Sequence, residues 1–296
     1  MSTRAVTGID LYDRAARAGS ACVIREYSTS FRFASGLLGR AVRPHIESIY
    51  ALVRVADEVV DGAAAEAGLS AADQLALLEA LEVETERAIR AGYSTNPVVH
   101  SFAVTARTHG IGTELTAPFF RSMRRDLDPV AFTAEELDEY IYGSAEVVGL
   151  MCLRVFLATD ARGVAGIDRE RLEHGARRLG AAFQKVNFLR DLADDWGERG
   201  RSYLPGVGPG LTERDKASIV ADIRADLDAA ADAIALLPSS SRRAVAAAHA
   251  LFAALTDRID RASADALLTR RVRVPTGNKL LLLAGASAGS FTRPAS

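Results

Sequence analysis

The chain has 296 residues, a formal net charge of -2 and 49% apolar residues. These numbers predict a globular protein with a sizeable core, and they exclude an extended basic surface for nucleic acid. Aromatic residues make up only 6% of a chain that is rich in alanine and leucine, a composition that favours helices over sheets.

The two cysteines, Cys22 and Cys152, lie in apolar surroundings and form no metal-binding or redox pattern. We therefore expect a reducing compartment. The first residues lack the apolar run of a signal peptide, and the apolar stretch from Leu280 to Ala284 is too short to span a bilayer. These features predict a cytoplasmic protein.

Helical patterns follow one another along the chain, separated by short breaks that carry capping residues and prolines. Neither an internal repeat nor strand alternation is present. Helices are expected at about residues 11–26, 31–40, 43–62, 70–91, 96–109, 113–124, 134–158, 167–196, 212–236, 239–262 and 264–271. Residues 1–10 and about 288–296 are expected to be loose ends. The sequence thus predicts a single all-α domain over residues 1–296.

Two of the predicted helices carry a similar charged stripe on an otherwise apolar surface. The first stripe consists of Arg54, Asp57, Glu58 and Asp61. The second stripe consists of Gln184, Asn187, Asp191 and Asp195, with Asp194 beside them. In each stripe the spacing of three or four residues places the side chains on one helix face.

The carboxylates of these stripes need a compensating cation. Like charges at i,i+4 cost a helix about 0.2–0.5 kcal/mol, and more when they are desolvated. Arg54 neutralises only part of the first stripe, so we expect Mg²⁺, with Mn²⁺ as the alternative. Histidine and cysteine are absent from both stripes, which argues against zinc or a di-iron centre. The metal ligands predicted in this way are Asp57, Asp61, Asp191 and Asp195.

Spacing alone is weak support for a metal site. The same i,i+4 aspartate pairs occur at Asp222/Asp226 and Asp228/Asp232, where the helix has a separate apolar side. We expect those two pairs to lie on a solvated face. For the two stripes, the alternative interpretation is a pair of structural ion-pair rows.

A third predicted helix places several small residues on one face. Under α-helical spacing this face consists of Tyr140, Gly143, Ser144 and Val147. Small residues permit close approach of another helix, which is the commoner case, or of a long thin ligand. Tyr140 either donates a hydrogen bond into a cavity or is satisfied in the core.

Together these segments resemble the head-to-head prenyl synthases, which are the squalene, dehydrosqualene and phytoene synthases. The resemblance covers about residues 20–280. Its motifs are Ser28 to Phe31, Tyr50 to Asp61, Gln184 to Asp195, and the following Gly200 to Pro205. The segment from Gly143 to Leu153 is most similar to bacterial phytoene synthases.

The resemblance implies an isoprenoid-synthase-type helical fold with a central cavity. It implies a phytoene synthase that joins two geranylgeranyl diphosphates through prephytoene diphosphate, in carotenoid biosynthesis. The implied catalytic residues are Tyr140, Gln184 and Asn187. The implied diphosphate-binding residues are Ser28, Ser30, Arg54, Arg190, Arg201 and Tyr203. Diphosphate itself is the implied proton acceptor, because no histidine lies in any motif.

Two alternatives stay open. A squalene or dehydrosqualene synthase would use farnesyl diphosphate, and the squalene synthase would also need NADPH, which a phytoene synthase does not. A non-catalytic assembly factor of the same fold would be expected to lose motif aspartates, and both pairs are intact. The lipid substrate and hydrocarbon product imply peripheral membrane contact, with downstream carotenoid enzymes as further partners.

The chain departs from the family's pattern at two positions. Glu146 replaces a glycine, and Phe252 stands where the family often has a tyrosine near the diphosphates. A basic residue expected to reach diphosphate is either Arg271 or Arg273.

Overall fold

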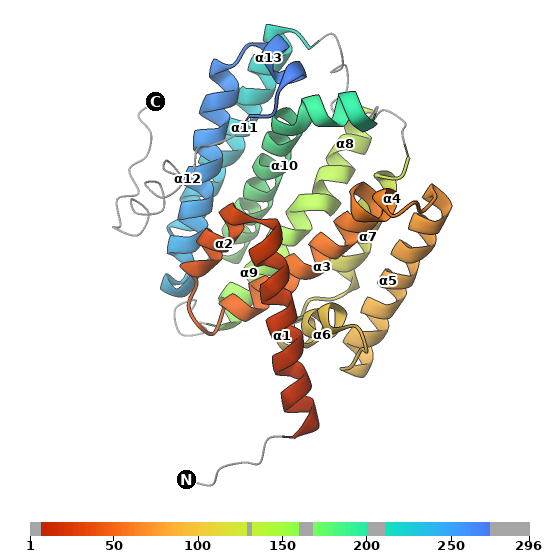
Figure 1. Cartoon of the computed structure of the whole chain (residues 1–296). Helices are drawn as coiled ribbons and strands as arrows, with labels where there is room; N and C mark the ends of the chain where they lie inside the picture. The colour runs from red at the N-terminus through yellow and green to blue at the C-terminus, as the bar shows by residue number, and fades with distance from the viewer. Residues whose placement is uncertain (1–6, 129–131, 160–167, 200–210, 273–296) are drawn as a thin grey trace.

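The computed structural model describes residues 7–128, 132–159, 168–199 and 211–272, apart from the side chains of Ser30 and of residues 194–199 (Figure 1). Every regular element in these ranges is helical. The elements are α1 (Gly8–Tyr27), α2 (Thr29–Gly36), α3 (Arg43–Asp61), α4 (Ala63–Glu66), α5 (Ala71–Ala91), α6 (Pro97–His109), α7 (Thr113–Arg125), α8 (Ala134–Ile141), η1 (Tyr142–Glu146), α9 (Val147–Thr159), α10 (Arg169–Arg199), α11 (Glu213–Ile234), α12 (Ser239–Arg261) and α13 (Ala264–Thr269). The predicted all-α fold is confirmed.

Two predicted boundaries at the start of the chain are wrong, and side-chain caps explain both. Helix α1 begins at Gly8, within the expected loose end, because Thr7 and Asp10 form a reciprocal capping box. Helix α2 begins at Thr29, earlier than expected, because the Ser28 hydroxyl accepts a hydrogen bond from the backbone N–H of Phe31 at 3.1 Å. The expected loose end at 288–296 lies outside the described residues.

The helix predicted over residues 134–158 is interrupted by a single π-helical turn, η1. The backbone N–H of Val147 bonds the carbonyl of Tyr142, five residues back. A π-turn holds one residue more than an α-turn of the same height, so side chains before and after it do not follow α-helical spacing. The common face predicted for Tyr140, Gly143, Ser144 and Val147 assumed α-helical spacing, which the π-turn interrupts.

Glycines allow the backbone of η1 and of the start of α9 to contact the backbones of α7 and α10 directly. A Cβ atom on Gly143 would lie 2.3 Å from the carbonyl oxygen of Pro118 in α7. A Cβ on Gly180 in α10 would lie 2.6 Å from the carbonyl oxygen of Ala145, and one on Gly149 would lie 2.6 Å from that of Ala176. Close helix packing thus accounts for the small residues at these positions.

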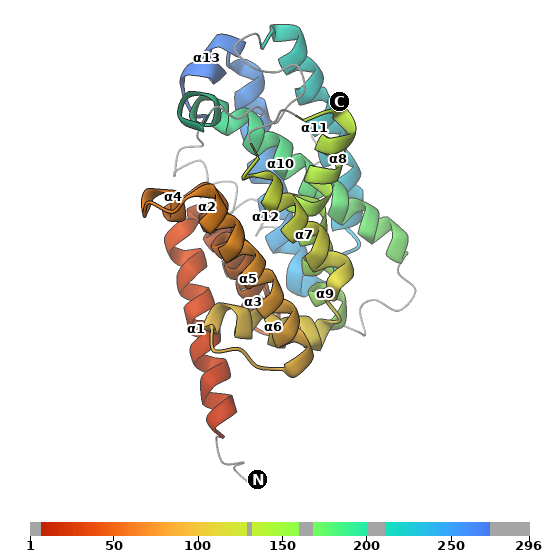
Figure 2. The same cartoon turned by 90° about the vertical axis from the view of Figure 1, so that its right-hand side faces the viewer.

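The buried apolar residues form two clusters. The first is built mainly from α3, α5, α6, α7 and α9, with Phe102, Phe119 and Phe120 among its largest members. The second is built mainly from α10, α11, α12 and α13. Helix α10 packs against η1 and α9 as well as α11, α12 and α13, so it joins the two halves. Figure 2 shows the first half, with α3 and α6 beside α1 and α5 packed against α3 and α6.

The segment Ala134–Thr159 is long and apolar enough to cross a membrane, judged by length and composition alone. Half of its most apolar stretch is buried inside the protein, as expected for a core helix. The packing of η1 and α9 against α7 and α10 agrees with that interpretation.

The prediction that Asp226 lies on a solvated face is wrong. Its side chain is only 3% exposed, and it accepts hydrogen bonds from Lys185 Nζ at 2.8 Å and Arg178 Nη1 at 3.1 Å, both on α10. Its predicted pair partner Asp222 is 58% exposed and forms an ion pair with the same lysine. Asp228 and Asp232 are exposed, as predicted. The cations that allow Asp226 to be buried belong to another helix, so they are invisible in the pattern of α11 itself.

Removing the Asp226 carboxylate should destabilise the fold. We expect Asp226→Ala to lower the free energy of unfolding by about 3 kcal/mol, because it leaves Lys185 and Arg178 without their shared buried acceptor. Asp222→Ala, which removes an exposed partner of the same lysine, should cost less than about 1 kcal/mol. Urea denaturation measures both values, and equal losses in the two variants would contradict the structural role of Asp226.

Candidate functional site

The first charged stripe lies on the last two turns of α3. Arg54 Nη1 donates to Asp57 Oδ2 at 3.0 Å, and the same guanidinium forms an ion pair with Glu58. It also lies over the ring of Tyr27, at 4.6 Å from the ring centroid. Burial opposes the charge of Arg54, but Asp57 and Glu58 outweigh it and hold the pKa of the guanidinium above its ordinary value. Arg54 is therefore fixed in place as the cation of this stripe.

The carboxylates of this stripe are less buried than the sequence predicted. The side chain of Asp57 is 40% exposed and that of Glu58 is 19% exposed, while Asp61 is half-buried. Val53, Val55 and Val59 are themselves only partly buried. The stripe thus lies on the border between the core and an open face, where carboxylates remain accessible to a ligand.

The second stripe lies on α10. Asp191 accepts hydrogen bonds from Arg190 Nε at 2.8 Å and from Arg271 Nη2 at 3.3 Å, and Arg271 Nε lies 2.8 Å from its Oδ1. Arg271 therefore reaches this stripe, whereas Arg273 lies outside the described residues. Gln184 and Asn187 are half-buried, and Asn187 Oδ1 is a buried acceptor without a partner in the described part of the structure. The side chains of Asp194 and Asp195 lie outside the described residues.

An aromatic cluster connects the beginnings of the two stripes. Phe183 and Phe252 stack with ring centroids 3.7 Å apart and an interplanar angle of 17°. Phe31 lies 5.9–6.3 Å from the rings of Tyr50, Phe183 and Phe252. Tyr50 precedes Arg54 by one turn and Phe183 directly precedes Gln184. Phe252 stood out in the sequence, but the cluster did not; its signal is the presence of scarce aromatic residues next to each motif.

The donor chemistry of the two stripes fits Mg²⁺, although the described side chains do not close a metal site. Asp57, Asp61 and Asp191 offer the hard oxygen ligands that Mg²⁺ prefers, and the unpartnered Asn187 Oδ1 adds another oxygen on the second stripe. Among the described side chains, no three His, Cys, Asp or Glu residues converge on one point. Helices α3 and α10 make no extended contact, and α9 packs against both. The predicted metal cage stays a prediction.

Tyr140 is buried, with 5% of its surface exposed. Its hydroxyl donates to the carboxylate of Asp126 at 2.7 Å, and Asp126 is itself only 6% exposed. The ring of Tyr140 lies 6.1 Å from that of Phe188, which follows Asn187 on α10. The structure thus places Tyr140 beside the second stripe. Asp126 was not predicted from the sequence, because it lies 14 residues away, at the C-terminal end of α7.

The remaining predicted site residues divide into one described side chain and three that are not described. The hydroxyl of Ser28 caps α2, and this structural role explains a serine at this position even if it binds no ligand. The side chains of Ser30, Arg201 and Tyr203 lie outside the described residues.

Glu146, the residue that replaces a family glycine, forms an ion pair across the contact between η1 and α10. Arg177 Nε donates to its carboxylate at 2.6 Å, and the Arg177 guanidinium lies 5.2 Å from the ring centroid of Tyr142. The nearby Ser144 hydroxyl is buried without a partner in the described part of the structure. Glu146, the last residue of η1, thus connects this turn to α10.

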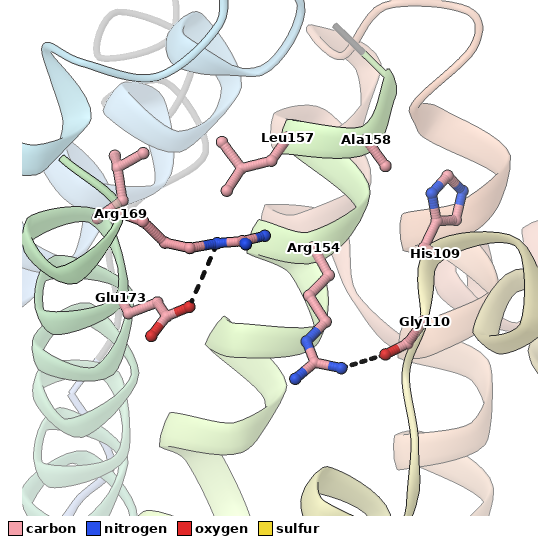
Figure 3. A pocket seen from close by; sticks show the side chains of 8 residues that line it. His109, Gly110, Arg154, Leu157, Ala158, Arg169 and Glu173 are labelled. Carbon is pink, nitrogen blue, oxygen red and sulfur yellow. Dashed lines mark hydrogen bonds and ion pairs between the residues drawn. The ribbon is translucent and has the colours of Figure 1, made fainter. Parts of the chain in front are cut away.

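A pocket of about 560 Å³ lies elsewhere, between α6, α9 and the start of α10 (Figure 3). Its lining includes His109, Arg154, Arg169 and Glu173. Arg154 bonds the carbonyl oxygen of Gly110, and Arg169 lies 3.6 Å from Glu173. Asp191 follows Glu173 by 18 positions along α10, which is roughly 27 Å along a helix. The pocket is therefore separate from the second stripe, and its lining contains none of the predicted site residues.

Comparison with known proteins places the chain in a family. Residues 24–207 match the squalene/phytoene synthase family, a stretch that includes both stripes. A 15-cis-phytoene synthase of Paracoccus sp. (strain N81106 / MBIC 01143) is 30% identical over 185 residues, which cover 62% of this chain and 58% of that protein. A phytoene synthase of Pseudescherichia vulneris is 33% identical over 185 residues, covering 60% and 56%. The matched stretch thus spans little more than half the length of these two relatives.

A longer match and two solved structures agree with this assignment. Phytoene synthase 3, chloroplastic, of Zea mays is 31% identical over 297 residues, covering 95% of this chain and 67% of that protein. A dehydrosqualene synthase in complex with ligand superposes with a TM-score of 0.77 at 21% identity, covering 94% of this chain and 98% of its own. A squalene synthase from Alicyclobacillus acidocaldarius gives a TM-score of 0.67 at 23% identity, covering 85% and 95%. The chain belongs to the squalene/phytoene synthase family and has the isoprenoid-synthase-type fold of these structures.

The contact between Arg271 and Asp191 should be measurable as a coupling between α13 and α10. In a double-mutant cycle with alanine at both positions, we expect a coupling of about 0.5–1 kcal/mol in the free energy of unfolding, which decreases at high ionic strength. Arg25 and Glu26 make an equally short contact of 2.9 Å but are 54% and 64% exposed, so their coupling should be close to zero. A zero value for Arg271 and Asp191 as well would show that Arg271 does not hold the stripe.

Proposed function

We propose that the protein is a Mg²⁺-dependent head-to-head prenyl synthase that joins two geranylgeranyl diphosphates through prephytoene diphosphate to phytoene, a step of carotenoid biosynthesis. The observation that carries this proposal is the location of both aspartate stripes, each with its arginine, inside the stretch that matches the family. The relatives that carry the name phytoene synthase, from bacteria and from Zea mays, support the choice of substrate.

Cations on both stripes supply the charge that the departing diphosphate needs. Arg54 on α3 and Arg190 with Arg271 at α10 are held beside carboxylates, so their guanidinium groups are oriented before a substrate arrives. Asp57, Asp61, Asp191 and Asp195 would hold Mg²⁺, which neutralises diphosphate and promotes its departure. Ionisation of the first substrate then yields an allylic cation, which the double bond of the second substrate attacks.

Apolar and aromatic walls protect such cations from water. The cluster of Phe31, Phe183 and Phe252 lies where the two stripes begin, and ring faces attract positive charge. Because Phe252 has no hydroxyl, the stacked pair of Phe183 and Phe252 contributes an apolar surface. Gln184 and Asn187 are polar residues in the turn of α10 that follows Phe183. We assign them to orienting the second substrate.

A C30 synthase is the second candidate, because the solved structures of similar fold are a dehydrosqualene synthase and a squalene synthase. Such an enzyme would use farnesyl diphosphate, with NADPH if its product is squalene. A non-catalytic assembly factor is the third candidate. Calorimetry would show whether the protein binds Mg²⁺ and inorganic diphosphate, and an assay for hydrocarbon product would show whether it also turns substrate over. We propose a cytoplasmic location with peripheral membrane contact and carotenoid enzymes downstream.

The product identifies the substrate. Purified protein incubated with geranylgeranyl diphosphate and Mg²⁺, without NADPH, should yield a C40 hydrocarbon on a chromatogram, and chelation of the metal with EDTA should stop its formation. Parallel incubations with farnesyl diphosphate, with and without NADPH, serve as the comparison. Product from farnesyl diphosphate alone would assign the C30 reaction instead.

The aspartate stripes can be tested against an aspartate of the same spacing elsewhere. Asp57→Ala and Asp191→Ala should each reduce kcat by at least about 100-fold, because each removes charge from a site that must stabilise the leaving group. Asp228→Ala, on the exposed face of α11, should leave kcat within about twofold. Circular dichroism checks that the variants stay helical, and near-normal turnover in either stripe variant would refute the two-stripe site.

A further inference from the structure

The pocket between α6, α9 and the start of α10 has more cationic than anionic side chains in its lining. Arg154 and Arg169 contribute two guanidinium groups, against the single carboxylate of Glu173. In Figure 3 the guanidinium group of Arg169 extends from α10 towards α9, and Arg154 reaches the carbonyl oxygen of Gly110. The remaining wall is apolar and consists of Leu157, Ala158 and Leu172.

The ion pairs of these two arginines are exposed, so a ligand can replace them. Arg169 Nε lies 3.6 Å from Glu173 Oε1, and the two side chains are 70% and 51% exposed. Arg154 Nη1 lies 2.7 Å from Oε1 of Glu114, which is 54% exposed. Exposed pairs of this kind contribute little to stability. An anion with two or more charges attracts guanidinium groups more strongly than a single carboxylate does.

His109, the last residue of α6, brings two unsatisfied polar atoms to the same pocket. Its Nδ1 and Nε2 are buried and have no hydrogen-bond partner in the described part of the structure. The neighbouring His45 contacts it edge to face, with ring centroids 4.3 Å apart, but pairs with Thr105 instead. Burial lowers the pKa of His109, so its ring is neutral, with one donor and one acceptor. An unsatisfied buried donor is costly, and a ligand oxygen would satisfy it.

We propose that this pocket is a binding site for a phosphate-bearing anion, held by Arg154, Arg169 and His109. Guanidinium groups bind phosphate oxygens in pairs, and the imidazole adds one N–H donor. The volume of about 560 Å³ is in the range of pockets for small organic ligands and exceeds the needs of one phosphate. The ligand is therefore free diphosphate, or a diphosphate ester whose organic group contacts the apolar wall. Binding here does not depend on the proposed reaction.

Isothermal calorimetry on the full chain in metal-free Tris buffer tests the site. Inorganic diphosphate should bind to one saturable site with a Kd of about 1 mM or lower. Arg154→Gln and Arg169→Gln should each weaken binding at least about tenfold, because each removes a charge-assisted hydrogen bond. Arg171→Gln is the matched control. This arginine follows Arg169 by two positions, is 52% exposed and lies 3.8 Å from Asp232, so its loss should change Kd by less than about twofold.

Two further measurements identify the ligand and the role of the histidine. Dimethylallyl diphosphate should bind more tightly than inorganic diphosphate if the ligand is an ester, and less tightly if the ligand is free diphosphate. His109→Phe should weaken diphosphate binding and raise the unfolding temperature of the ligand-free protein, because it removes two unsatisfied buried polar atoms. An unchanged Kd in this variant would contradict the assignment of His109.

Two outcomes would overturn the proposal as a whole. One is the absence of saturable binding of either diphosphate at concentrations up to about 10 mM. The other is an unchanged Kd in the double variant Arg154→Gln/Arg169→Gln, which would place the anion elsewhere, such as at the arginines of the two stripes. None of these variants alters a stripe residue. Failure of the pocket would therefore leave hydrocarbon formation intact, and failure of the proposed function would leave binding in the pocket intact.

Discussion

The structure depends on the close approach of the π-turn η1 to α7 and α10. No side chain fits at Gly143 or Gly180, because a Cβ atom there would overlap a neighbouring carbonyl oxygen. This contact fixes how α10 lies against the rest of the protein, and α10 carries the second charged stripe. The ion pair of the largely buried Glu146 with the half-exposed Arg177 spans the same contact, so it reinforces what the glycines permit. The position of the candidate site thus follows from backbone packing.

The two stripes are supported by different parts of the core. The first stripe lies on α3, which belongs to the first apolar cluster, and the second lies on α10, which belongs chiefly to the other. Aromatic rings from α2, α3, α10 and α12 meet between them. Each stripe also has its own arginines, so each holds its charges without the other. This arrangement suits the proposed site, in which two ligands with one negative end each bind between two preformed surfaces.

Most helices could be predicted from the sequence, because apolar spacing and capping residues are local signals. The two charged stripes were also readable from residue types and spacing, whereas the metal site that they predict stays a prediction. The π-turn was not, since it arises from contacts with other helices and its five residues carry no distinct composition. The ion pairs of Asp226 with α10, the contact of Arg271 with Asp191 and the bond from Tyr140 to Asp126 all join different elements. Pairings of this kind depend on tertiary packing, which a single helix pattern does not contain.

The π-turn also has a consequence for the length of the chain in this region. Because η1 holds one residue more than an α-turn, loss of one residue between Tyr142 and Glu146 would restore a continuous α-helix. Everything on the N-terminal side would then rotate by about 100° relative to α9. Tyr140 would turn away from Asp126 even though neither residue had changed. In this segment, the number of residues matters as much as their identity, so a deletion would be more damaging here than most substitutions.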